Sequence, residues 1–209
     1  KAGRILIAIK PQMLEDAAPA IAQLVGPDTV ILSILAGVEV DALKAHFPEA
    51  RRIVRVMPNL PVALGKGVVA LYAPDGPDGE TDALMAPLGL VEWFEDEDQL
   101  HLVASLAASG PAFLYRFIDA LGIAATRLGM DAGQAGRLAL AMVDGASSLA
   151  VRAADPPAAL AEKVASKGGM TRKGLDILDA DDDLIGLLER TLDAAQKRSV
   201  ELGEAAKRA

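Results

Sequence analysis

The residues best suited to bind an anion lie in the segment from Ser166 to Thr171, which runs straight into a helical pattern. Gly168 and Gly169 let the backbone adopt positive φ angles and approach a ligand closely. Thr171 stands where a helix N-cap is expected, so free N–H groups should follow it. A loop that feeds a helix N-terminus is suited to a carboxylate or a phosphate. An ordinary turn between two helices has the same pattern, so this segment alone leaves both interpretations open.

A second group of candidate residues stands where the first three predicted strands end: Lys10 and Pro11, then Ala36 and Gly37, then Asn59. Dinucleotides bind open α/β sheets at the carboxyl ends of the strands, and these residues should share one edge of the sheet. The small Ala36 and Gly37 would let a cofactor pass close, and Asn59 would hydrogen-bond near a nicotinamide. The structural alternatives are a solvated lysine and a turn asparagine after proline.

The elements that must position these residues change character at the acidic run 95–98. Before it, apolar runs alternate with helical patterns, which predicts a mostly parallel sheet covered by helices. Strands are expected at 4–9, 29–35, 52–56, 67–72 and 90–94, and helices at 13–25, 40–46 and 84–88. We expect the first strand to be buried on both faces, and we interpret the run 95–98 as a solvated junction.

After this junction the sequence predicts helices only. Their expected starts are Ser109-Gly110-Pro111, Asp131, Asp155, Thr171 and Asp182-Asp183. The helix from Pro111 is apolar almost all round and must be buried on several sides, which in a domain of roughly 110 residues predicts a subunit interface. We interpret His101 and an Arg116–Asp119 ion pair as structural. The predicted domains are therefore 1–96, for dinucleotide binding, and 97–209, for substrate binding and dimerisation.

The composition excludes several classes of protein. The chain has 209 residues, a net charge of −8, no cysteine and two histidines. Disulfides, thiolate metal sites and a cysteine nucleophile are excluded, and we expect no metal site. The negative charge argues against nucleic acid or an anionic membrane as a partner. No apolar run reaches the roughly 20 residues of a membrane span, and the short run 5–9 does not resemble a signal peptide, so we expect a cytoplasmic protein.

Five motifs, taken in order, resemble those of the pyrroline-5-carboxylate reductase family. They are Ile9-Lys10-Pro11-Gln12, Ala36-Gly37-Val38, Arg55-Val56-Met57-Pro58-Asn59, Ser109-Gly110-Pro111-Ala112-Phe113 and the segment from Ser166 to Leu175. The resemblance implies an α/β Rossmann-like N-terminal domain followed by an all-α C-terminal dimerisation domain. It also implies a homodimer, or a larger assembly, that reduces 1-pyrroline-5-carboxylate to L-proline with NADPH or NADH.

The resemblance also implies roles for the candidate residues. Thr171 is the catalytic candidate, because the matching threonine contacts the ring nitrogen. The substrate-binding candidates are Val164, Ser166, Gly168, Gly169, Met170, Thr171 and Ser109, and the cofactor-binding candidates are Lys10, Pro11, Ala36, Gly37 and Asn59. Ser109 either caps its helix or contacts the ligand. The family usually has proline at Lys167 and threonine at Met170, so a reductase of a different imine or oxo acid stays open.

The G-x-G-x-x-G/A phosphate loop with which the family begins has no counterpart in this sequence. That loop and its helix N-terminus normally hold the pyrophosphate. We expect the Rossmann-like domain to be incomplete as given, because everything downstream matches. The alternative is a non-catalytic helical dimer that has lost cofactor binding. The residues that distinguish NADPH from NADH belong to the same missing region, so the choice between them stays open.

Overall fold

A computed structural model of the chain describes residues 1–208; Ala209, the last residue of the predicted helical domain, lies outside them. The chain divides into two compact units. The first, here called the sheet unit, runs from Lys1 to Gly110 and includes the C-terminal segment that starts at Thr191. The second, the helical unit, runs from Pro111 to Arg190.

The sheet unit contains five strands in the spatial order β1-β2-β3-β4-β5. Their bounds are β1 Arg4–Ile7, β2 Val30–Ser33, β3 Arg52–Pro58, β4 Gly67–Tyr72 and β5 Gly89–Trp93. All neighbouring pairs are parallel except β3 and β4, which confirms the predicted mostly parallel sheet. The antiparallel pair has a simple cause: the segment 59–66 is too short for a parallel crossover, which needs a dozen or more residues.

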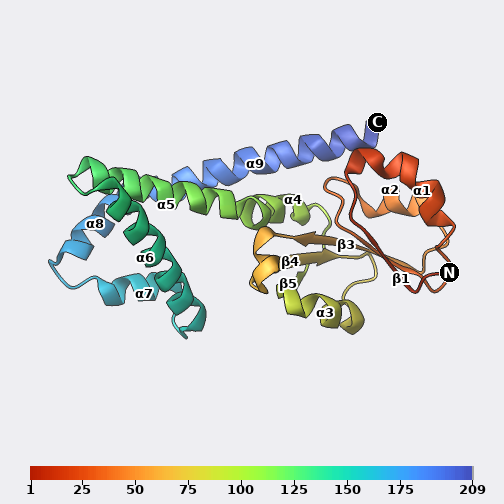
Figure 1. Cartoon of the computed structure of the whole chain (residues 1–209), viewed down its shortest axis with the longest axis horizontal. Coiled ribbons are helices and arrows are strands. Elements are labelled where there is room, and N and C mark those ends of the chain that lie inside the picture. Colours follow the sequence, from red (N-terminus) through yellow and green to blue (C-terminus); the bar gives the residue numbers. More distant parts are fainter. Residues whose placement is uncertain (209) are drawn as a thin grey trace. The chain divides into compact units, whose positions relative to one another are not determined.

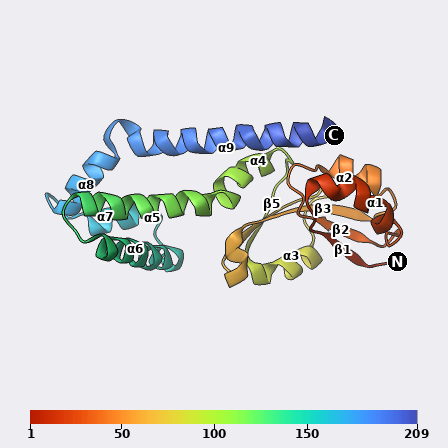
Figure 2. The same ribbon diagram turned by 45° about the horizontal axis from the view of Figure 1, so that its top comes forward.

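Helices cover both faces of the sheet (Figures 1 and 2). One face carries α1 (Leu14–Ala22) and α2 (Val40–His46), and the other carries α3 (Gly79–Met85). Short 3-10 turns, η1 (Pro11–Met13), η2 (Leu60–Leu64) and η3 (Ala86–Leu88), complete the connections. Alternate residues of β3 point to the two apolar cores: Ile53 packs with Leu43 and Phe47, and Val54 packs with Met85. The helix predicted over 13–25 is shorter than expected and ends at Ala22.

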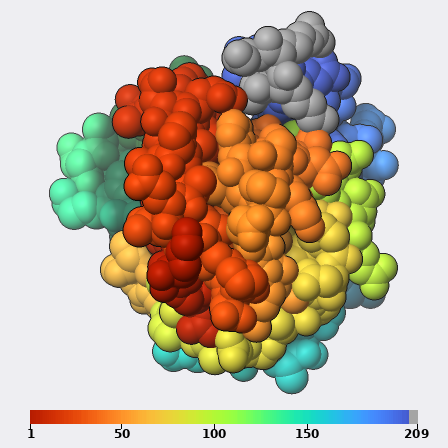
Figure 3. Space-filling view, turned by 90° about the vertical axis from the view of Figure 1, so that its right-hand side faces the viewer, coloured from red at the N-terminus to blue at the C-terminus, as the bar shows by residue number. Residues whose placement is uncertain are grey.

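The prediction that the first strand is buried on both faces is wrong. β1 is an edge strand, and Figure 3 shows the red N-terminal residues on the surface of the sheet unit. Ile7 is buried against the α1–α2 face, whereas Leu6 on the opposite face is 58% exposed. The apolar run 4–9 is typical of a central strand, but an edge position and a partly uncovered face cannot be recognised from the run itself.

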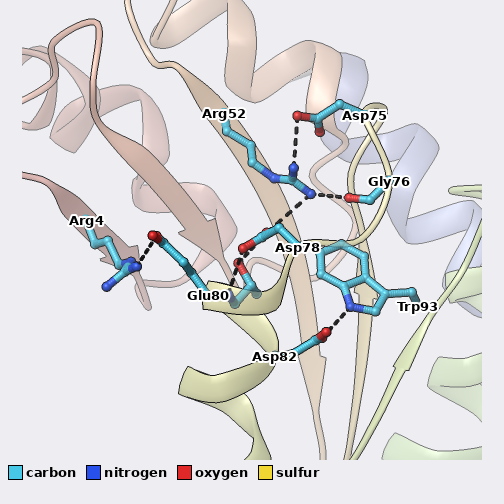
Figure 4. A network of polar contacts seen from close by, with 9 residues as sticks. Arg4, Arg52, Asp75, Gly76, Asp78, Glu80, Asp82 and Trp93 are labelled. Carbon is cyan, nitrogen blue, oxygen red and sulfur yellow. Dashed lines mark hydrogen bonds and ion pairs between the residues drawn. The ribbon is translucent and has the colours of Figure 1, made fainter.

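Arg52, at the start of β3, fixes the loop that leads to α3 (Figure 4). Its guanidinium contacts the Asp75 carboxylate at 2.9 Å, the Asp78 carboxylate at 3.4 Å and the Gly76 carbonyl, and it stacks on Trp93. Asp78 in turn caps α3 by accepting a hydrogen bond from the Thr81 N–H. This charged cluster lies at the amino end of β3, away from the predicted cofactor edge.

A nearly continuous helical rod leads out of the sheet unit. It consists of α4 (Gln99–Val103), a π-helical turn η4 (Ala104–Ala108) and α5 (Gly110–Arg127). The predicted helix start at Ser109-Gly110-Pro111 is confirmed, because α5 begins at Gly110, but Ser109 has helical backbone angles, with φ −84° and ψ −23°, and is not an N-cap. Pro111 clashes with the carbonyl four residues earlier in a regular α-helix. A π-turn directly before it, which widens the helix, accommodates the proline inside the rod.

The helical unit contains the remainder of this rod, α6 (Ala132–Arg152), α7 (Pro157–Val164), α8 (Met170–Leu178), the short turn η5 (Ala180–Asp182) and the start of α9 (Asp183–Arg208). Asp131 caps α6 as predicted, because its carboxylate accepts from the Gln134 N–H at 3.0 Å. The predicted Arg116–Asp119 ion pair is also present, at 2.7 Å. Within residues 111–190, only Gly122, Ala135 and Ala139 are buried.

Candidate functional site

The carboxyl ends of β1, β2 and β3 form the candidate cofactor edge. The three strands are adjacent and parallel, so the segments that follow them leave the sheet on the same side. Lys10 is exposed and precedes η1, which begins at Pro11; its carbonyl accepts from the N–H of Met13, the last residue of η1. Ala36 is exposed after β2, and Asn59 is half-buried after β3. The topology thus brings the predicted cofactor residues to one edge.

The structure requires glycine at position 37, which the sequence did not predict. Its φ is +74°, and a Cβ there would lie 3.1 Å from the Cα of Gly203 on α9. The C-terminal half of α9 therefore packs against the loop after β2, next to α1 and α2 (Figure 1). His101 Nδ1 and Ser199 Oγ, 2.9 Å apart, join α4 to the same helix, so the structural interpretation of His101 is confirmed.

Asn59 ties the end of β3 to two other elements. Its Oδ1 accepts from the Val68 N–H at 2.9 Å, and its Nδ2 donates to the Ala107 carbonyl at 3.0 Å. In a regular α-helix the Ala107 carbonyl would accept from residue 111, but Pro111 has no N–H. Asn59 supplies that donor and therefore has a structural role. The bond also connects the motif that ends at Asn59 with the motif that contains Pro111.

The interpretation of the run 95–98 as a solvated junction is wrong for Glu97, whose side chain is only 19% exposed. Its Oε1 accepts from Arg55 Nη1 at 3.0 Å and from the Val40 N–H at 2.9 Å. Arg55 is only 4% exposed. A charge within the apolar strand Ile53-Val54-Arg55-Val56 requires a buried partner, and that requirement could have directed attention to the acidic run.

Tyr72 pairs with Arg55 in the antiparallel register, and the charges in this region affect the pKa of its hydroxyl. Burial raises the pKa of its hydroxyl, and the negative charges of Glu97, Asp96 and Asp41 raise it further, while Arg55 acts in the opposite direction. The phenol is therefore a neutral neighbour of the Arg55–Glu97 pair across the physiological pH range. It supplies no charge that would compete with Glu97 for the guanidinium.

The candidate substrate loop is a tight turn between α7 and α8. The Gly169 N–H donates to the Ser166 carbonyl at 3.0 Å, and Gly168 has a φ of +72°. A Cβ on Gly169 would lie 2.3 Å from Ser166 Oγ and 3.2 Å from the Ser166 carbonyl oxygen, so any larger residue would require the Ser166 hydroxyl to move. Lys167 has the negative φ that the second position of such a turn requires, so the turn forms without proline at this position.

The prediction that Thr171 caps α8 is wrong. The helix begins at Met170, and Gly169, with extended backbone angles, takes the N-cap position. Thr171 is instead half-buried in the first turn. The N–H groups of Met170, Thr171 and Arg172 lack acceptors within the helix, so the expected anion-binding character of this segment is retained. Val164 and Met170 are 70% and 92% exposed.

Arg172 anchors the first turn of α8 to the end of α7. Its guanidinium forms a hydrogen-bonded ion pair with the exposed Glu162 carboxylate. The side-chain hydrogen bond and the charge of Arg172 lower the pKa of Glu162, and the same hydrogen bond raises the pKa of Arg172. Arg172 is therefore a charged residue in the helix turn that the predicted carboxylate site uses.

Across residues 1–208, no helix combines the length and apolar character needed to cross a bilayer.

Comparison with known proteins identifies the family of this chain. The family model for pyrroline-5-carboxylate reductase dimerisation matches residues 97–202. A pyrroline-5-carboxylate reductase of Pseudomonas aeruginosa is 32% identical over 204 residues, which cover 96% of this chain and 74% of that protein. One of Haemophilus influenzae is 31% identical and covers 97% of this chain and 76% of its own length.

Solved structures agree with these relatives. A pyrroline-5-carboxylate reductase of Coxiella burnetii superposes with a TM-score of 0.89 at 30% identity, and the match covers 97% of this chain and 76% of that one. The Plasmodium falciparum pyrroline carboxylate reductase, solved with NADP bound, has the same fold, with a TM-score of 0.79 at 22% identity over 97% of this chain and 78% of its own. Both matches extend over the sheet unit and the helical unit.

Proposed function

Because the chain belongs to the pyrroline-5-carboxylate reductase family, we propose that it reduces 1-pyrroline-5-carboxylate to L-proline with NADPH or NADH. The observation that carries this conclusion is the match to the Pseudomonas aeruginosa reductase, which extends over 96% of the chain and therefore includes both candidate sites. The dimerisation domain of the family matches residues 97–202, which include the whole helical unit, and the protein is a homo-oligomer. We assign the reaction to the cytoplasm, where the nicotinamide pool is available.

The substrate carboxylate is assigned to the N-terminus of α8. Three N–H groups, from Met170 to Arg172, and the positive end of the helix dipole favour an anion at this position. Arg172 places a guanidinium in the same turn, paired with the Glu162 carboxylate. The Ser166–Gly169 turn presents its backbone without intervening side chains at Gly168 and Gly169. Thr171 is assigned to the ring nitrogen, which its hydroxyl can reach by hydrogen bonding once the carboxylate is fixed.

The dinucleotide is assigned to the carboxyl edge of β1–β3. The residues there fit it: Lys10 offers an exposed ammonium, and Ala36 exposes backbone with only a methyl group in the way. Reduced nicotinamide, when bound, supplies the hydride for the C=N carbon. The chain's own contribution is then to bind, to orient and to fix the imine, and orientation alone accounts for large rate effects. Solvent can supply the proton that activates the imine nitrogen.

The experiment that tests this function measures NADPH and NADH oxidation by the full-length protein with 1-pyrroline-5-carboxylate, beside Thr171→Ala and Thr171→Ser. We expect turnover, and a fall in kcat/KM of about 10- to 100-fold for Thr171→Ala, the range of a lost hydrogen bond to a charged group. Thr171→Ser keeps the hydroxyl and should retain most of the activity.

Two results would contradict the assignment in different ways. Nucleotide binding without turnover would indicate a different imine or oxo acid, for which the exposed Met170 in the substrate loop is the specific reason. No nucleotide binding at all would favour a non-catalytic dimer.

A further inference from the structure

We propose that Glu97 is a positioning residue that holds the loop after β2 in the shape that binds the dinucleotide. Glu97 acts on this loop through its hydrogen bonds with Val40 and Arg55. The inference rests on the proposed function, because it places the dinucleotide on the loop of residues 36–39. It adds a residue in the 95–98 run to the determinants of cofactor affinity.

The first contact fixes the end of the loop. Val40 is the first residue of α2, and its N–H has no acceptor within the helix. The Glu97 carboxylate, 2.9 Å from the Val40 N–H, serves as the cap from a distant part of the chain. A carboxylate at a helix N-terminus is also favoured by the helix dipole.

The second contact fixes Glu97 itself. The carboxylate is 3.0 Å from Arg55 Nη1, and the two side chains are only 19% and 5% exposed. Arg55 lies on the same face of β3 as Ile53. It pairs with Ser33 of β2 on one side and with Tyr72 of β4 on the other. A pair with so little water around it is strongly directional, and removing the carboxylate would leave both a buried cation and an unpaired N–H.

Together these contacts hold the loop from one end while α9 holds it from the other. Gly37 lies against Gly203, and Val40 is bound to Glu97. A loop held at both points is already ordered before the cofactor arrives, so binding costs less conformational entropy. Without Glu97, the α2 end of the loop is free to move and the cofactor must order it.

The test compares Glu97→Ala, Glu97→Gln and Glu97→Asp in the full-length protein, with the exposed Glu95→Ala as the matched control. NADPH affinity is measured by fluorescence titration, the KM for 1-pyrroline-5-carboxylate by steady-state kinetics, and folding by thermal melts. We expect the Kd for NADPH to rise about tenfold in Glu97→Ala and about threefold in Glu97→Gln, whose amide oxygen still accepts from Val40. The substrate KM should change less than twofold in both.

Glu97→Asp keeps the proposal testable if the alanine variant does not fold. It keeps the charge that Arg55 needs, but its shorter side chain cannot reach both donors, so the Kd should again rise several-fold. An unchanged Kd in variants that fold would overturn the inference, as would an equal rise in the substrate KM, which would indicate general disturbance. If the unmodified protein bound no NADPH, the proposed function would fail, and the inference with it.

Discussion

The two units of this protein differ in how they bury apolar side chains. In the sheet unit, valine, leucine, isoleucine and phenylalanine fill two cores, one on each face of the sheet. In the helical unit, no apolar side chain larger than alanine is buried within residues 111–190, and Leu114 and Phe117 of α5 are 45% and 47% exposed. The sheet unit therefore forms its core within one chain. The helical unit presents an apolar surface, which fits its place within the dimerisation domain of the family.

The largest expected effect comes from breaking the helical unit's interface. Phe117→Glu places a charge on an apolar surface at a cost of about 2 kcal/mol or more, and two-fold symmetry doubles the cost for a dimer. The dimer dissociation constant should rise by roughly a thousandfold, with loss of turnover. Analytical ultracentrifugation measures the first and NADPH oxidation the second.

The matched control lies in the sheet unit. Leu84 on α3 is 46% exposed, about as much as Phe117, so Leu84→Glu makes the same change in similar solvent. It should leave the dimer intact. If both variants weakened the dimer equally, the claim that the apolar surface of the helical unit, and not that of the sheet unit, forms the interface would be contradicted.

Ion pairs also differ between the two units, and breaking them should have a smaller effect than breaking the interface. Arg52→Met in the sheet unit removes a guanidinium that is only 11% exposed and contacts two carboxylates. We expect the sheet unit to lose about 2 kcal/mol of unfolding free energy. Arg116→Met in the helical unit breaks a pair with a 79% exposed arginine and should cost less than about 0.5 kcal/mol. Urea denaturation measures both, and equal losses would contradict the account.

Asp78 gives the sheet unit a pH dependence. Burial acts to raise the pKa of this carboxyl, but hydrogen bonds from Thr81 and the charge of Arg52 outweigh it, so the pKa lies below its ordinary value of 3.8. A lowered pKa stabilises the fold above the unfolded value, and this contribution is lost as the pH falls through the folded value.

Asp78→Asn tests this contribution, because asparagine still caps α3 while it removes the charge. The variant should be less stable than the unmodified protein at pH 7. The difference in unfolding free energy should shrink as the pH falls below the ordinary value of 3.8 and disappear below the folded pKa, where the aspartate is protonated in both states. Urea denaturation at several pH values measures it. A constant difference across the whole range would mean that the charge of Asp78 contributes nothing.

The smallest expected effect concerns the substrate loop. Glu162→Gln weakens the exposed pair with Arg172 that joins α7 to α8. Because exposed pairs contribute little, we expect the KM for 1-pyrroline-5-carboxylate to change by no more than about threefold, with unfolding free energy unchanged. Steady-state kinetics measures the KM. A change of an order of magnitude would mean that Arg172 needs this partner to serve the carboxylate.

Local pattern was enough to predict much of the fold. The helix at 40–46 and the strand at 67–72 have the bounds that the sequence predicted. The cap of α6 by Asp131 and the mostly parallel sheet were also predicted, because capping spacing and buried apolar runs are local signals. The order of the motifs was enough to identify the family.

Long-range partners were not predictable in the same way. The exposure of Leu6 depends on β1 being an edge strand, and the burial of Glu97 depends on Arg55, which lies 42 residues earlier. Gly37 is required by a helix near the other end of the chain, and Asn59 bonds to a carbonyl that Pro111 leaves without a donor. None of these pairings has a fixed sequence spacing. The roles of the candidate site residues stay predictions until ligands are bound.

The measurement that tests the central claim most directly is a crystal structure of the full-length protein with NADP⁺ and L-proline. We predict the proline carboxylate on the N–H groups of Met170 to Arg172 with the ring nitrogen at the Thr171 hydroxyl, and the dinucleotide along Lys10, Ala36 and Asn59. Proline bound away from the N-terminus of α8, or a dinucleotide away from the carboxyl ends of β1–β3, would contradict the account.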